Sequence, residues 1–340
     1  KLTISGNTLT SIGSKAFENA ALLADVYAEP TTAPAVQADS FSGAGTSVQG
    51  SKTFHVASVE AYSSWTTAAS GYTMEALGPD YLSEGLYYRT SGEDPWKSEI
   101  PQTFTTLYVK TAGDNTVMTA EQMKAVADAV KALAAPATVD FSEVVYESET
   151  FPNSFKSNAN LAGIVFPQNV TKTASAAFQK TGMTSVTLLK GISYGSNAFD
   201  SCASLVSVTV EEGVTEIGNY MFQNTKLTDV TLPNSVTKIG ASAFNGCSLT
   251  TINFGQGVKT IENSAFQNCG ELTEIILPDA TETLGQNAFG DCPKLAKISL
   301  GKNMKTLEAY CFVGYSKGCP LLGDIICRAT TPPTLKDDYG

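Results

Sequence analysis

A repeated unit in the second half of the chain constrains its fold more than any other feature. A phenylalanine returns every 21 to 23 residues, at Phe155, Phe178, Phe199, Phe222, Phe244, Phe266, Phe289 and Phe312. Alanine usually precedes it, and an apolar triplet follows it with the spacing L-x-x-I-x-L, as in Leu272, Ile275 and Leu277. A fixed period of this length predicts stacked coils with a common core, because one coil cannot bury its apolar side alone.

The triplet predicts one short strand per coil. Its last two apolar residues stand two positions apart, as a half-buried strand requires. No window between the triplets sustains the 3.6-residue period of a helix. We therefore expect an α+β/β solenoid with parallel strands, built from about eight coils of roughly 22–23 residues.

The run LTDVTLPNSVTKIGASAFNGC, residues 227–247, resembles the BspA-type leucine-rich repeat found in surface proteins of Bacteroidetes and some other microbes. It matches the pattern L-x-x-I-x-L-P-x-x-V-x-x-I-G-x-x-A-F-x-x-C at nearly every position. The resemblance covers residues 155–335 well and the first 77 residues partly. Two early units depart from it, with Thr173 in place of isoleucine and Met183 in place of leucine. It implies a cell-surface or extracellular protein that adheres to host proteins or other microbes.

The chain carries parts of two arrays. DVYAEPTTAPAV, residues 25–36, aligns without gaps on DIICRATTPPTL, residues 324–335. We therefore expect residues 1–78 to hold the last coil and C-terminal cap of a first array, and residues 151–340 to form a second. An open solenoid end exposes core and unpaired strand edge. Since no such cap follows the second array, we expect the polypeptide to continue beyond Gly340 or to leave this end open to a partner.

Residues 79–150 break the period and are predicted to connect the arrays. VMTAEQMKAVADAVKALAAP, residues 117–136, reads as an amphipathic helix with a capping box at Thr119 and Gln122. Strands are expected on both sides of it, and together these elements cap the start of the second array. Residues 78–99 are predicted to be a loop-rich connector. The apolar stripe of the helix comprises Met123, Val126, Val130 and Leu133.

The cysteines recur at repeat positions, and no C-x-x-C spacing occurs among them. Five share one position, two or three residues before the leucine of the triplet. All seven are expected inside the coils, where a thiol behaves as a small apolar group. Adjacent coils lie about 5 Å apart, so bridges between them stay possible, although we favour free thiols over bridges or a metal site. The seven are Cys202, Cys247, Cys269, Cys292, Cys311, Cys319 and Cys327.

Composition and motifs exclude several functions. The net charge of −11 argues against nucleic-acid binding and against an electrostatic hold on anionic lipid. No apolar run reaches the roughly 18–20 residues that cross a bilayer. The single histidine, His55, lacks a neighbouring nucleophile motif, and no phosphate-binding or calcium loop is found. We therefore expect no enzyme and no catalytic, cofactor or metal site.

The positions between the apolar strand residues are small and rich in hydroxyl groups. If the strands form one parallel sheet along a face, these side chains point outward together. Threonine forms strands well, so the pattern has a purely structural interpretation beside a binding one. Ile276 and Ser299 belong to the same set of outward positions. The possible partner-binding face comprises Thr184, Ser185, Thr187, Ser207, Thr209, Thr228, Asp229, Thr231, Thr250, Thr251, Asn253, Thr273, Glu274 and Lys297.

Three functions stay open from the sequence. The first is recognition of, or adhesion to, an extended protein partner through that face, because such a surface lacks a deep pocket. The second is glycan binding in a polysaccharide-capture system, and the third is a passive spacer. Glycan binding needs exposed aromatic residues, for which the candidates are Trp65, Tyr72, Tyr87, Tyr88 and Trp96.

Overall fold

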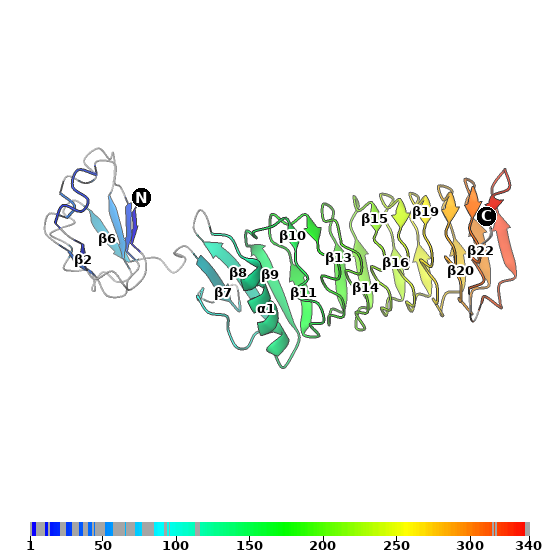
Figure 1. Cartoon of the computed structure of the whole chain (residues 1–340), viewed down its shortest axis with the longest axis horizontal. Helices are drawn as coiled ribbons and strands as arrows, with labels where there is room; N and C mark the ends of the chain where they lie inside the picture. Colours follow the sequence, from blue (N-terminus) through cyan, green and yellow to red (C-terminus); the bar gives the residue numbers. More distant parts are fainter. Residues whose placement is uncertain are drawn as a thin grey trace. The chain divides into compact units, whose positions relative to one another are not determined.

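The structure, a computed structural model, consists of two compact units, which are described separately (Figure 1). The first comprises residues 1–85 and 112–115, and the second comprises residues 86–111 and 116–340. Residue placement is described for 2–4, 11–12, 14–20, 25–28, 34–36, 40–42, 44, 52–56, 65, 72–76, 85–91, 94, 96–112, 116–314, 316 and 318–336. The domain boundaries expected after residues 78 and 150 remain predictions.

The first unit contains a parallel sheet and a small aromatic core. The sheet order is β1-β3-β5-β6, where the strands are β1 (Leu2–Ile4), β3 (Asp25–Ala28), β5 (Thr53–Val56) and β6 (Thr73–Ala76). A second pair joins β2 (Ser11–Ile12) to β4 (Ala35–Val36). Phe41, Phe54 and Trp65 are buried together, and the Trp65 indole Nε1–H donates to the Pro34 carbonyl at 2.9 Å. The indole therefore packs in the core and has its polar atom satisfied.

The second unit begins with a four-stranded sheet of order β11-β9-β8-β7 and one helix. The strands are β7 (Gly85–Arg89), β8 (Thr106–Ala112), β9 (Ala137–Glu143) and β11 (Leu161–Val165), and the helix is α1 (Ala120–Ala132). The predicted helix and its flanking strands are confirmed, as is the capping box of Thr119 and Gln122. The prediction of a loop-rich connector is wrong at β7, where Tyr88 turns into the core.

Helix α1 packs on the first coil of the array and is joined to it by hydrogen bonds. Met123, Val126 and Val130 are fully buried on its inner side. Asn158 Nδ2 donates to the Ala127 carbonyl at 2.8 Å, and Asn160 Nδ2 donates to the Leu133 carbonyl at 2.8 Å. The Asn160 amide thereby satisfies a carbonyl at the helix end that lacks a partner within the helix, while the Asn158 amide adds a second bond to a carbonyl in the last turns.

Most of the following coils contribute strands to two rows. The first row, which carries the apolar triplets, comprises β13 (Ser185–Leu188), β14 (Ser207–Val210), β16 (Asp229–Thr231), β18 (Thr251–Asn253), β20 (Glu274–Ile276), β22 (Lys297–Leu300) and β24 (Asp324–Cys327). The second row comprises β15 (Glu216–Ile217), β17 (Lys238–Ile239), β19 (Thr260–Ile261), β21 (Thr283–Leu284), β23 (Thr306–Leu307) and β25 (Thr334–Leu335). At the start of the array, β10 (Thr150–Phe151) pairs with β12 (Lys172–Thr173).

The longest sheet of the array lies on the second strand row and not on the row of the apolar triplets. The second row forms a continuous six-stranded parallel sheet, whereas the first divides into β13-β14, β16-β18 and β20-β22-β24. The predicted solenoid with parallel strands is confirmed, and its triplet strands form three short parallel sheets.

A column of phenylalanines explains the repeat period. The rings from Phe178 to Phe289 stack coil upon coil, with centroids 5.1 to 5.7 Å apart. The backbone turns sharply around each ring, with left-handed residues two positions before and after it, such as Ser264 and Asn268 beside Phe266. Asparagine and serine suit this turn because bulky or branched side chains strain a left-handed backbone.

Candidate recognition surface

The predicted face is exposed on the first strand row. All of its fourteen predicted residues are exposed except Lys297, which is half-buried. Strand pairing aligns them from coil to coil, so that Thr187 lies opposite Thr209 and Asp229 lies opposite Thr251. We call these fourteen residues the threonine face.

Of the strand positions that were predicted to point outward, one is buried. Ser299 is buried because the larger Ile276 and Ile326 flank it on the neighbouring strands. Ile276 itself is exposed, as predicted. At this end of the threonine face, Lys297 and Glu274 neutralise each other's charge, because Lys297 Nζ lies 2.7 Å from Glu274 Oε1.

The hydroxyl groups of the threonine face are only partly used within the chain. Thr228 Oγ1 donates to Asp229 Oδ2 at 3.0 Å, and Thr250 Oγ1 donates to the Thr228 carbonyl at 3.0 Å. For the Thr209 and Thr231 hydroxyls, the described residues supply no hydrogen-bond partner. Exposed hydroxyls of this kind are able to donate to or accept from a polar ligand.

A groove of about 480 Å³ opens at one end of the threonine face, between β11 and β13. Its floor contains Phe166, Met183 and Phe199, which belong to the apolar core. Ser185 and Thr187 of the threonine face line its rim. The groove thus joins exposed hydroxyls to apolar side chains below them.

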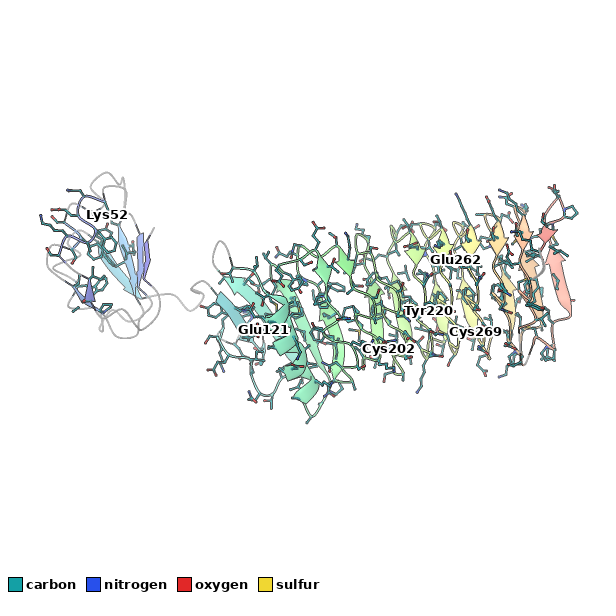
Figure 2. The ribbon with its side chains drawn as sticks, in the orientation of Figure 1. Lys52, Glu121, Cys202, Tyr220, Glu262 and Cys269 are labelled. Atoms are coloured by element: carbon teal, nitrogen blue, oxygen red, sulfur yellow. The ribbon has the colours of Figure 1, made fainter. Side chains whose placement is uncertain are left out.

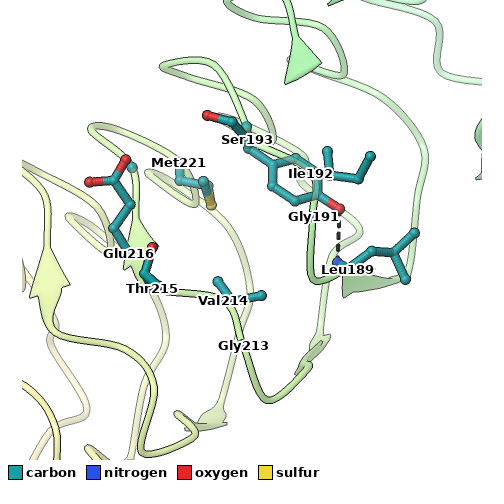
Figure 3. A pocket seen from close by; sticks show the side chains of 11 residues that line it. Leu189, Gly191, Ile192, Ser193, Gly213, Val214, Thr215, Glu216 and Met221 are labelled. Atoms are coloured by element: carbon teal, nitrogen blue, oxygen red, sulfur yellow. Dashed lines mark hydrogen bonds between the residues drawn. The ribbon is translucent and has the colours of Figure 1, made fainter. Parts of the chain in front are cut away.

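A smaller pocket of about 270 Å³ lies elsewhere in the array, around Tyr194 (Figure 3). Tyr194 stands where later coils place the isoleucine of the second row, and in this coil an isolated bridge of Ser193 with Lys172 stands in place of a strand. The Leu189 N–H donates to the tyrosine oxygen at 3.1 Å, and burial raises the pKa of Tyr194 to about 12. The only carboxylate lining the pocket is Glu216, so the pocket offers no pair of carboxylates for acid–base chemistry.

The prediction that five cysteines share one position of the repeat is confirmed by their common hydrogen bond. Each of five thiols donates to the carbonyl of a phenylalanine in the preceding coil, at 3.0 to 3.3 Å. Cys202 and Cys269 are two of them (Figure 2). Thr181 and Thr225 fill the same position in other coils, and their hydroxyls lie 3.3 Å from the neighbouring thiols.

Two cysteines contradict the expectation that all seven are internal. Cys319 is half-buried and Cys327 is exposed, because β24 is the last strand of its sheet. The other five are buried, and burial raises the pKa of Cys247 to about 11 and of Cys311 to about 12. Thiols with raised pKa values are poor nucleophiles and poor metal ligands near neutral pH.

The aromatic candidates for glycan binding are mostly unsuited to it. Trp65 and Tyr88 are buried, which contradicts their prediction as exposed platforms. Trp96 is half-buried, and the Arg89 guanidinium lies 4.2 Å from its ring centroid. A sugar ring needs a free aromatic face, and Arg89 already occupies one face of Trp96.

The described residues also bear on metal binding, on the single histidine and on membrane spans. Within these residues, no group of three histidine, cysteine or acidic side chains is placed to hold a metal ion. His55 lies in β5, but its side chain is outside the described residues. Over the described ranges, no helix combines the length and apolar character needed to span a membrane.

Comparison with known proteins assigns the repeat. The family model for the BspA type leucine rich repeat region matches six copies, over residues 145–194 and 192–318, which is more than half of the chain. No curated protein matches the sequence.

The matches among solved structures have low identity and TM-scores below 0.5. A leucine rich cell surface protein from Faecalibacterium prausnitzii is 17% identical, with a TM-score of 0.42 over 90% of this chain and 79% of that one. A leucine-rich repeat protein from Eubacterium ventriosum is 17% identical, with a TM-score of 0.37 over 68% and 92%. The leucine-rich repeat protein of T. pallidum is 18% identical, with a TM-score of 0.31 over 68% and 78%. The family assignment rests on the repeat match, and by that match the chain belongs to the BspA-type leucine-rich-repeat family.

Proposed function

We propose that this chain is a non-enzymatic recognition protein of the cell surface or extracellular space, and that its threonine face adheres to a protein partner. The observation that carries the proposal is the alignment of exposed, mostly uncharged side chains from successive coils on one strand row. Such a surface is long and shallow, which suits an extended protein partner better than a small molecule.

The two other functions have weaker support. Burial of Trp65 and Tyr88 removes most of the aromatic platform that a glycan site needs. A passive spacer needs no free hydroxyls, whereas Thr209 and Thr231 present theirs to solvent. Both functions remain outcomes of the experiment below.

The test uses two matched pairs of exposed threonines from the same coils. The face variant is Thr209→Glu with Thr231→Glu, and the control is Thr215→Glu with Thr237→Glu, outside the threonine face. Binding of the whole chain is measured on immobilised extracellular-matrix and bacterial surface proteins, with a glycan array in parallel. We expect the face variant to bind a protein target at least about tenfold more weakly and the control to be unchanged, because desolvating a charge at an interface is costly.

Three outcomes would contradict the proposal. Equal binding by both variants would place the contact elsewhere on the chain. Binding to glycans alone would favour the capture function. Binding to none of the targets would favour the spacer.

A further inference from the structure

The groove between β11 and β13 lies at a break between two sheets. β11 is the edge strand of the sheet that begins the second unit, and β13 pairs on its other side with β14. The two coils are in contact just before these strands, where the Gly182 N–H donates to the Asn158 carbonyl at 3.3 Å. Beyond that point no backbone hydrogen bond of the described residues joins the strands, so two strand edges face each other unpaired.

The β11 strand that borders this break is irregular on its other side. The register of β11 on β9 shifts between Leu161 and Gly163, which marks a bulge. A side chain at Gly163 would place its Cβ 3.0 Å from Thr138 Oγ1, so the outer surface of β11 stays flat there. Ile164 and Val186, which face the interior, are only half-buried because the coils diverge.

The other breaks in the strand row have different surroundings. Between β18 and β20 lies a pocket of about 400 Å³ whose lining includes the charged Asp279 and Arg328, and Arg328 donates to the Leu277 carbonyl at 2.9 Å. Between β14 and β16, as between β11 and β13, the coils are joined just before the strands, here by the Lys226 N–H, which donates to the Leu205 carbonyl at 3.0 Å. The break at β11 and β13 differs from the one at β18 and β20 in that its groove is lined by uncharged residues alone.

We propose that this groove is the anchoring site of the threonine face and takes an extended, uncharged segment of the partner protein. One aliphatic or aromatic side chain of the segment enters the groove between Ile164 and Val186, while its main chain bonds to an edge of β11 or β13. The groove lining contains no charged residue, so a charged side chain would lose its hydration without compensation. The unpaired edges call for backbone donors and acceptors, which a strand-like segment supplies and a lipid or sugar does not.

This inference rests on the proposed function, and its first test uses a defined probe. The probe is the blocked peptide acetyl-TFTFT-amide, with acetyl-TDTDT-amide as its control. We expect the first peptide, at millimolar concentration, to slow hydrogen exchange in residues 161–166 and 183–189 of the whole chain, and the second to have no effect. No slowing by the first peptide, or equal slowing by both, would overturn the inference.

The second test uses matched substitutions at one strand position. Thr187→Arg places a charge on the groove rim, and Thr231→Arg places it at the same position two coils further on; both residues are exposed. Ser185→Arg is a second rim variant, and circular dichroism verifies that each variant folds. We expect the rim variants to weaken both the peptide effect and partner binding by at least about tenfold, and Thr231→Arg to preserve the peptide effect and to weaken partner binding less.

The outcomes separate the two proposals. Equal loss of partner binding in Thr187→Arg and Thr231→Arg would leave the threonine face as the binding surface and remove the groove as its anchor. Unchanged partner binding in all three variants would overturn both the groove and the threonine face.

Discussion

At the scale of single residues, the array depends on the buried phenylalanine of each coil. Phe266 is fully buried, and its ring centroid lies 5.2 Å from that of Phe244 and 5.1 Å from that of Phe289. Its N–H donates to the Ala288 carbonyl of the next coil at 2.8 Å, so the same residue joins coils through side chain and backbone. Each ring therefore supports two neighbours.

We predict that Phe266→Ala lowers the free energy of unfolding by about 3–5 kcal/mol, because it removes both stacking contacts and leaves a cavity. Phe266→Leu fills much of the space and is expected to cost about 1.5 kcal/mol. Urea unfolding followed by circular dichroism gives both values. Equal losses in the two variants would mean that the ring itself is not what joins the coils.

At the scale of whole coils, charge adds a second pattern to the stack. One coil carries four acidic residues and the next carries four lysines, each pair 23 positions apart. All four pairs are formed in the structure, at 2.5 to 2.9 Å. The acidic residues are Glu271, Glu274, Asp279 and Glu282, and their partners are Lys294, Lys297, Lys302 and Lys305.

These pairs predict loss of stability in acid. Hydrogen bonds from Lys302 and Lys305 lower the pKa values of Asp279 and Glu282. A carboxyl group whose pKa falls on folding contributes stability above its unfolded pKa and loses it as the pH falls through the folded value. We therefore expect the melting temperature to fall below about pH 4, the usual range for these carboxyls.

The variant with all four acidic residues changed to lysine tests the contribution of the pairs directly. Eight like charges then face each other, so its melting temperature should fall at low salt and recover partly in about 1 M NaCl. Changing the four partner lysines to glutamate as well should restore it without added salt. A melting temperature that stays constant in the first variant would mean that the pairs contribute nothing measurable.

At the scale of the molecule, each coil of the second unit contacts mainly its neighbours. The backbone bonds of the second strand row run from one coil to the next, as from β17 to β19 and from β19 to β21. The stability of such an array is approximately the sum of the free energies of its individual coils and of the interfaces between neighbouring coils. The array should therefore tolerate a change in the number of its coils.

We predict that deleting residues 245–266, one complete coil, leaves the array folded. Phe244 then stacks on Phe289, and the strand rows close around the gap. Far-UV circular dichroism should keep its shape, and the denaturant slope should fall in proportion to the surface lost. Deleting residues 245–255, about half a coil, shifts all later residues out of phase and should unfold the array. Similar behaviour of both deletions would contradict the repeat architecture.

The sequence alone determined the coil, because spacing and apolarity act locally and identically in every repeat. Phe222, Leu227, Val230 and Leu232 were predicted inside, and all are buried. The capping box of α1 was equally local, since Thr119 and Gln122 lie three residues apart. The outward direction of the threonine face followed from the two-residue alternation of a strand.

Only the tertiary structure decided how the coils meet. The unbroken second row, the burial of Ser299 between two isoleucines and the open break beside Gly163 depend on the distance between coils. That distance depends on how each coil packs on its neighbours and on single irregularities such as one bulge, which no repeat pattern encodes. Burial of Trp65 likewise required a carbonyl that lies 31 positions away in the sequence.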